Sequence, residues 1–293
     1  MGNRKEISLR KIISIAQTEY VKWICNPRMI IFFCLIIFIY DYIILEMKGA
    51  AGELSTHCMA LEPFLAIGNS ALLILLIPVV FITLLGDFPK TDGNTMFYIY
   101  RTGKKNWIFG QMLFAFMADL TFLVSMLIFS VLFALPFSEW TLKWSDVTRK
   151  YTYYFPEKSG SLVANLLTNR LYNNLTPLQA FGYTYSLMVL YLLLIAVIML
   201  TGFAFGKRIA GMVINCGIMC LGTAFSLTED IIKWYFPAAN TVSWMHFDHY
   251  MKKQIFDIRN SYLYFIVIIL VLIVIDVNAI HRYDFAKVTD MED

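Results

Sequence analysis

Six long apolar stretches, none of which contains Lys or Arg, constrain this chain more than any other feature. A helix of about 20 predominantly apolar residues spans the hydrocarbon core of a bilayer. Only 15% of the residues are charged, against roughly 25% in soluble domains, which excludes an ordinary water-soluble fold. The sequence therefore predicts an all-α polytopic membrane protein with six transmembrane helices. The predicted spans are Met29–Leu45, Phe64–Leu85, Trp107–Leu135, Pro177–Phe205, Ile209–Leu227 and Ser261–Ile280.

The basic residues between these spans are distributed unevenly. On one side of the membrane 14 of 65 residues are Lys or Arg, and on the other side 10 of 92. The positive-inside rule makes the denser side cytoplasmic, so both termini are expected in the cytoplasm. We expect an N-terminal segment at 1–28, a transmembrane domain at 29–280 and a cytoplasmic tail at 281–293 of a multi-pass protein of a bacterial cell membrane.

The segment Ile7–Ile24 has a helical pattern ahead of the first span. Apolar residues such as Ile12, Ala16 and Trp23 recur at helical spacing, and Arg10 and Lys11 are among the polar residues between them. This pattern is typical of an amphipathic helix that lies in the headgroup layer. An ordinary packing helix is the alternative.

A second patterned segment, "GDFPKTDGNTMFYIYRTGKKNW", joins the second and third spans. Asp92 is a suitable N-cap, and Gly103 is a suitable C-terminal stop for a short helix. Aromatic residues and Arg often dominate protein–protein contacts, so the helix is either a contact for another protein or a structured turn on the headgroups. We expect Trp23, Lys104, Lys105 and Trp107 to lie at the membrane interface.

An amphipathic helix, a short helix ending in Arg101-Thr102-Gly103, and Trp107 and Gly110 opening the third span together resemble the permease subunits of ABC-2 type transporters. The resemblance covers the whole topology. It implies that Ile7–Ile24 is the elbow helix and Asp92–Arg101 the coupling helix. Many members carry Pro after the coupling helix, whereas this chain has Arg101-Thr102-Gly103. The expected ATPase contacts are Asp92, Gly93, Asn94, Thr95, Met96, Phe97, Tyr98 and Arg101.

The sequence contains no P-loop, because the nearest string, Gly202-Phe-Ala-Phe-Gly206-Lys207-Arg208, has the wrong spacing and no Ser or Thr after Lys207. We interpret it as the tight turn between the fourth and fifth spans. The chain itself is therefore not expected to be an enzyme, to hold a cofactor or to hold a metal. The resemblance implies that ATP and Mg²⁺ bind to two copies of a separate ATPase subunit.

Polar residues inside the spans are expensive in lipid and often mark functional sites. Asp119 is the deepest carboxylate, and two interpretations of it remain open: contact with a cationic cargo group, or hydrogen bonds across helices to Asn69 or Asn215. We take Asn69, Asp119 and Asn215 as candidate residues of a substrate pathway.

The function that we expect is export of an amphipathic peptide, a toxin or a lipophilic compound. Two permease chains, identical or related, would form the pathway within membrane lipid, and nucleic acid is not an expected partner. The alternatives are an integral membrane enzyme that acts on lipids and a non-transporting membrane sensor or scaffold.

Overall fold

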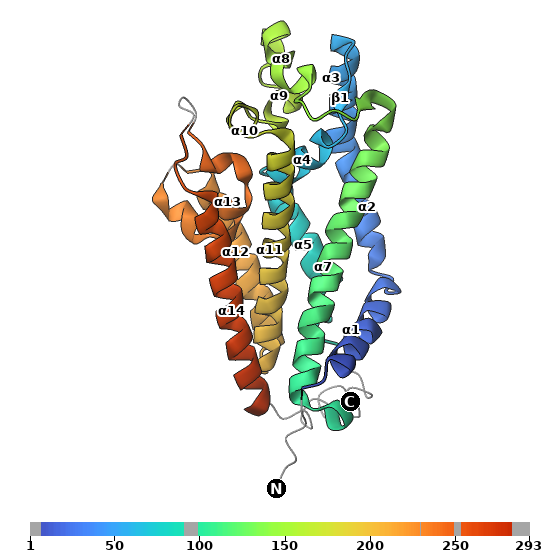
Figure 1. Ribbon diagram of the computed structural model, residues 1–293, viewed down its shortest axis with the longest axis vertical. Helices are drawn as coiled ribbons and strands as arrows, with labels where there is room; N and C mark the ends of the chain where they lie inside the picture. The colour runs from blue at the N-terminus through green and yellow to red at the C-terminus, as the bar shows by residue number, and fades with distance from the viewer. Residues whose placement is uncertain (1–6, 91–98, 229, 249–252, 283–293) are drawn as a thin grey trace.

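The computed structural model describes residues 7–90, 99–228, 230–248 and 253–282. Long helices run roughly along one axis (Figure 1). The lower end in Figure 1, which we call the basal end, holds α1 (Leu9–Ile24) and the beginning of α7 (Lys104–Ala134). The upper or distal end holds α8 (Asp146–Tyr154) and α9 (Leu162–Leu166).

Five described helices are long and apolar enough to cross a membrane, which agrees with an all-α polytopic protein. The second predicted span, Phe64–Leu85, differs from the expectation. It is divided into α4 (Glu62–Asn69) and α5 (Leu73–Leu84), which are bent by 84° from each other, and the total is six if this pair counts as one span. The five helices are Met29–Leu54, Lys104–Phe137, Pro177–Ala204, Arg208–Ser226 and Ile258–Ile280.

Side chains from distant parts of the sequence support the break after Asn69. Its amide nitrogen donates to Leu65 O at 2.9 Å and to Thr184 Oγ1 at 3.2 Å. The next residue, Ser70, is extended, so the helix stops there. The carbonyl of Asn69 accepts a hydrogen bond from Trp244 Nε1 at 3.1 Å. Because a buried carbonyl without a partner is costly, this bond stabilises a break that the apolar sequence pattern does not reveal.

The first span continues past its predicted end at Leu45. It consists of α2 (Met29–Ile39), the π-helical η1 (Tyr40–Leu45) and α3 (Glu46–Leu54). The predicted loop 46–63 therefore begins as helix, and the helix ends where Ser55 adopts a left-handed conformation with φ 50°. A short parallel pair, β1 (Cys58–Met59) with β2 (Ser138–Glu139), then joins this segment to the end of α7.

Short helices fill the two long distal connections. The first connection contains η2 (Leu135–Phe137), α8, η3 (Pro156–Lys158), α9 and α10 (Asn169–Asn174). The second contains η4 (Ile231–Tyr235), α13 (Pro237–Thr241) and η5 (Ser243–His246).

Helix α11 (Pro177–Ala204) is the centre of the bundle and contacts α14 (Ile258–Arg282), α12 (Arg208–Ser226), α7 and α4. Its beginning agrees with the predicted start of the fourth span at Pro177, and Thr176 and Gln179 form a capping box around this first turn. At its end, the predicted tight turn leads into α12 through Gly206, whose φ is 70°. A Cβ on Gly202 would meet Gly211 Cα at 2.7 Å, so glycine allows the two helices to approach this closely.

Candidate functional site at the basal end

Helix α1 packs along the first half of α7. A Cβ on Gly110 would lie 2.6 Å from Ile15 Cγ2, so the two helices touch where α7 has no side chain. Tyr20 Oη and Thr121 Oγ1 are 2.8 Å apart, and Ser8 N donates to Asn106 Oδ1 at 2.8 Å. These contacts hold α1 against α7 at both of its ends.

The apolar residues predicted for one face of α1 divide into two groups. Ile12, Ala16 and Trp23 are buried, whereas Leu9 and Ile24 are exposed. The buried group is what a packing helix requires, and the exposed group is what a helix in the headgroup layer requires. The two interpretations of this segment therefore describe different faces of the same helix.

Residues 99–102 are helical and are joined to α7 by one residue, Gly103. Gly103 has a φ of 92°, which confirms the predicted glycine stop. Tyr100 is 85% exposed and Arg101 is also exposed, whereas Ile99 and Thr102 are buried. Asn106 Nδ2 donates to Thr102 O at 2.7 Å and so ties this helix to the first turn of α7.

Most of the predicted ATPase contact lies outside the described residues. The predicted contacts outside the described residues are Asp92, Gly93, Asn94, Thr95, Met96, Phe97 and Tyr98. The remaining predicted contact, Arg101, lies within the described residues.

An ion-pair cluster joins three segments at the basal end. Both oxygens of Asp87, which follows α5, face the guanidinium of Arg28 between α1 and α2, at 2.8 and 3.1 Å. Arg208, at the start of α12, lies 3.8 Å from Asp87 Oδ1 and donates to Gly86 O at 3.0 Å. Sequence reasoning missed this cluster. The available signal was a carboxylate directly after an apolar span, on the side of the protein that is rich in Arg and Lys.

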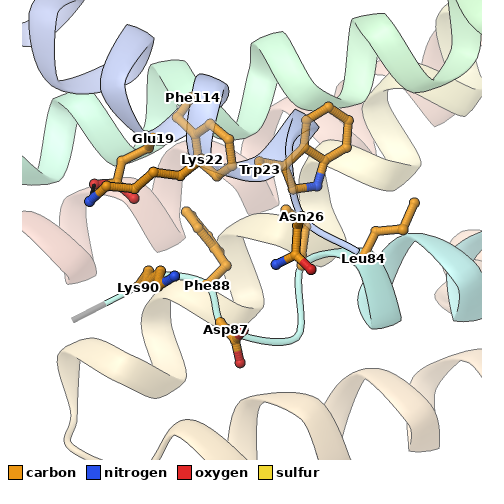
Figure 2. Close-up of a pocket in the computed structure, with 10 residues that line it drawn as sticks. Glu19, Lys22, Trp23, Asn26, Leu84, Asp87, Phe88, Lys90 and Phe114 are labelled. Carbon is orange, nitrogen blue, oxygen red and sulfur yellow. Dashed lines mark hydrogen bonds and ion pairs between the residues drawn. The ribbon is translucent and has the colours of Figure 1, made fainter. Parts of the chain in front are cut away.

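A small cavity of about 30 Å³ opens between α1 and the segment after α5. Figure 2 shows Trp23, Phe88 and Phe114 around it, with Lys22 beside Glu19 at a distance of 3.3 Å. The ring of Phe114 contacts both Trp23 and Phe88. Because α1, α7 and the segment after α5 meet at these rings, a movement of one of them is resisted by the other two.

The predicted membrane-interface residues have different environments. The indoles of Trp23 and Trp107 are buried in protein, and Trp107 packs against Phe203 of α11 with ring centroids 5.7 Å apart. Lys104 and Lys105 are partly exposed in the first turn of α7. Trp107 thus connects α7 to α11. The sequence alone does not distinguish this contact from anchoring of the tryptophan in lipid.

The three candidate pathway residues are buried, and hydrogen bonds do not join them to one another. Asn69 bonds to Thr184, and Asn215 Nδ2 donates to Ile195 O at 3.0 Å. Asp119 is fully buried in α7, and neither carboxylate oxygen has a hydrogen-bond partner among the described residues. The considered bonds from Asp119 to Asn69 or Asn215 are therefore not formed, because each amide nitrogen is directed at a partner on its own helix or on α11.

The basal end thus joins several segments by packing. Residues 99–102, Gly103 and the 31-residue α7 follow one another along the chain. The packing of α1 and the ring of Trp107 connect α7 to other helices, and the Asp87 cluster joins the segment after α5 to the α1–α2 connection and to α12. A scan against models of known protein families and searches of curated proteins and solved structures found no match to this chain.

Proposed function

We propose that this chain is the membrane-spanning permease subunit of an ABC-2 type exporter. ATP and Mg²⁺ bind to a separate ATPase, two copies of which dock at the basal end, and this end faces the cytoplasm. The single observation that carries the proposal is the path along the chain from the exposed Tyr100 and Arg101 through Gly103 into α7. A force applied to residues 99–102 is transmitted to α7. It reaches α1 and α11 because both helices pack against α7.

Two further observations support a mechanical role. The sequence has no P-loop, so a separate subunit must hydrolyse ATP if the work of this chain needs ATP. The exposed apolar side chains of α2, α12 and α14 suit contact with lipid or with a second permease chain. The cargo that fits an apolar, aromatic-rich bundle is an amphipathic peptide, a toxin or a lipophilic compound.

The proposal is tested by purifying the tagged chain from its own cells and identifying the proteins that accompany it. We expect a stand-alone P-loop ATPase, and we expect Arg101→Glu and Phe97→Ala to release it. Lys143→Glu is the matched control, because it makes the same change of charge as Arg101→Glu on an exposed residue before α8, at the distal end. If both variants retain the ATPase as well as the control does, the coupling-helix assignment is wrong.

A further inference from the structure

A large cavity lies at the distal end, away from the basal site. Its volume is about 600 Å³, and its described walls come from α8, α9, α10 and Trp244 of η5. Cavities of about 300–1,000 Å³ hold small-molecule or cofactor ligands, so this one is large enough for a ligand of drug size. It lies outside the helices that are long enough to span a membrane, beyond the end of α7 and before the start of α11.

The chemistry of the cavity wall is polar and carries a positive charge. The described lining residues include hydroxyl and amide side chains and Arg170, and they include no Asp or Glu. The guanidinium of Arg170 lies over the ring of Trp244, 5.6 Å from its centroid. Among the described residues, no carboxylate lies within ion-pair distance of Arg170. A guanidinium held in this way can form two parallel hydrogen bonds with one carboxylate or phosphate.

A second polar group in the wall also has no partner. Thr168 Oγ1 is buried, and no described residue forms a hydrogen bond with it. Thr168 is the N-cap residue of α10, yet its side chain does not cap the helix. Buried polar groups are usually paired, so this hydroxyl marks incomplete hydrogen bonding behind the cavity wall, closed to a ligand in the described conformation.

We propose that the distal cavity binds the carboxylate end of a short peptide segment, with Arg170 as the carboxylate ligand. The amide of Asn169 is available to the peptide backbone, and Val163 and Leu167 to its apolar side chains, whereas Asn165 Nδ2 already donates to Ser161 O at 3.0 Å. A peptide is favoured over a lipid phosphate because the walls are short helices outside the spans, where the ligand arrives from water. Binding at this site does not depend on the proposed transport function.

The cavity is connected to the broken second span. Trp244, which lies under the guanidinium of Arg170, donates from its indole to Asn69 O at the bend between α4 and α5. Ser243 Oγ, next to it, lies 3.0 Å from Thr184 Oγ1, and Thr184 in turn bonds to Asn69. A ligand that moves Trp244 therefore acts on the hydrogen bonds that hold this bend.

The test uses the full chain in lipid nanodiscs and a mixed-sequence pentapeptide library without Asp or Glu. The library is made once with free C-terminal carboxylates and once as C-terminal amides, and binding is measured by equilibrium dialysis with mass spectrometry. We expect the carboxylate library to be retained roughly tenfold more strongly, since charge-assisted hydrogen bonds are about twice as strong as neutral ones. Arg170→Gln should abolish this preference. Lys150→Gln, which removes a positive charge from α8 outside the cavity, should keep it.

A second variant protects the test against misfolding. Ala164→Trp fills the cavity without changing Arg170, and it should reduce binding of the carboxylate library while thermal unfolding and gel filtration remain as in the wild type. The proposal is overturned if both libraries are retained equally or not at all. It is also overturned if Arg170→Gln keeps the preference, or if dihexanoyl phosphatidylglycerol and glycerol phosphate bind in an Arg170-dependent manner while the peptides do not.

Discussion

The contact between α1 and α7 can be tested with a single methyl group. In Gly110→Ala the new Cβ would lie 2.6 and 2.7 Å from two atoms of Ile15, and 3.3 Å from Ile12 O. These distances are shorter than normal van der Waals contact, so α1 must move away from α7. Gly182→Ala is the matched control, because it places the same methyl group on α11 where no atom lies within 4 Å.

The expected magnitude is the difference between two opposing effects. Replacing glycine by alanine inside a helix stabilises it by about 1 kcal/mol. Forcing an extra methyl into a filled contact costs about 1–3 kcal/mol. Gly182→Ala should therefore increase the free energy of unfolding by about 1 kcal/mol, and Gly110→Ala should fall about 1–3 kcal/mol below that control.

Two assays measure this effect. Denaturant unfolding in detergent gives the global free energy. In a background whose native cysteines are replaced by serine, since four of them are exposed, maleimide labelling of a cysteine introduced by Ala16→Cys, which is fully buried in α1, reports local opening. Gly110→Ala should increase the labelling rate by about tenfold for each 1.4 kcal/mol that the local contact loses. Ile15→Ala removes the contact with Cγ2 but keeps Ile15 Cβ, which lies 2.7 Å from the new methyl, so the double variant should be more stable than additivity predicts by only part of the clash of about 1–3 kcal/mol. If Gly110→Ala is as stable as Gly182→Ala and labels no faster, α1 does not pack against α7 as described.

Three further predictions follow from other contacts. Gly202→Ala should lower the free energy of unfolding by about 1–3 kcal/mol relative to Gly217→Ala in denaturant titrations. The new Cβ at position 202 would meet backbone atoms of α12, whereas a Cβ at position 217 meets nothing within 4 Å. Equal stability of the two variants would contradict the close approach of α11 and α12. Burial lowers the pKa of His246 to about 4, from about 6.5 in the unfolded chain. The neutral imidazole should therefore contribute roughly 3 kcal/mol to the free energy of unfolding above pH 6.5, and this contribution should be lost as the pH falls to about 4. His246→Gln should lack this pH dependence in thermal unfolding scans, and a wild-type pH profile in this variant would refute the assignment. Asp87→Asn should cost less than about 1 kcal/mol, because its ion pair with Arg28 is exposed to solvent, and a larger loss in the same titrations would mean that the pair is effectively buried.

The amino-acid sequence was sufficient for features that depend on local pattern. The apolar runs predicted the long helices, the span beginning at Pro177 predicted the start of α11, and Gly103 predicted the stop before α7. Each of these depends on the composition of one segment or on the conformational preference of one residue. The helical spacing of α1 was also visible, but not which of its apolar residues are buried.

Only the tertiary structure decided how distant segments meet. The break at Asn69 is held by Trp244, the ion-pair cluster joins Asp87 to Arg28 and Arg208, and the distal cavity needs Trp244 beside Arg170. No local pattern encodes these contacts, since hydropathy identifies that a segment is apolar without identifying its neighbours. Burial and hydrogen-bond partners are properties of packed pairs, and a single segment of sequence contains one member of each pair.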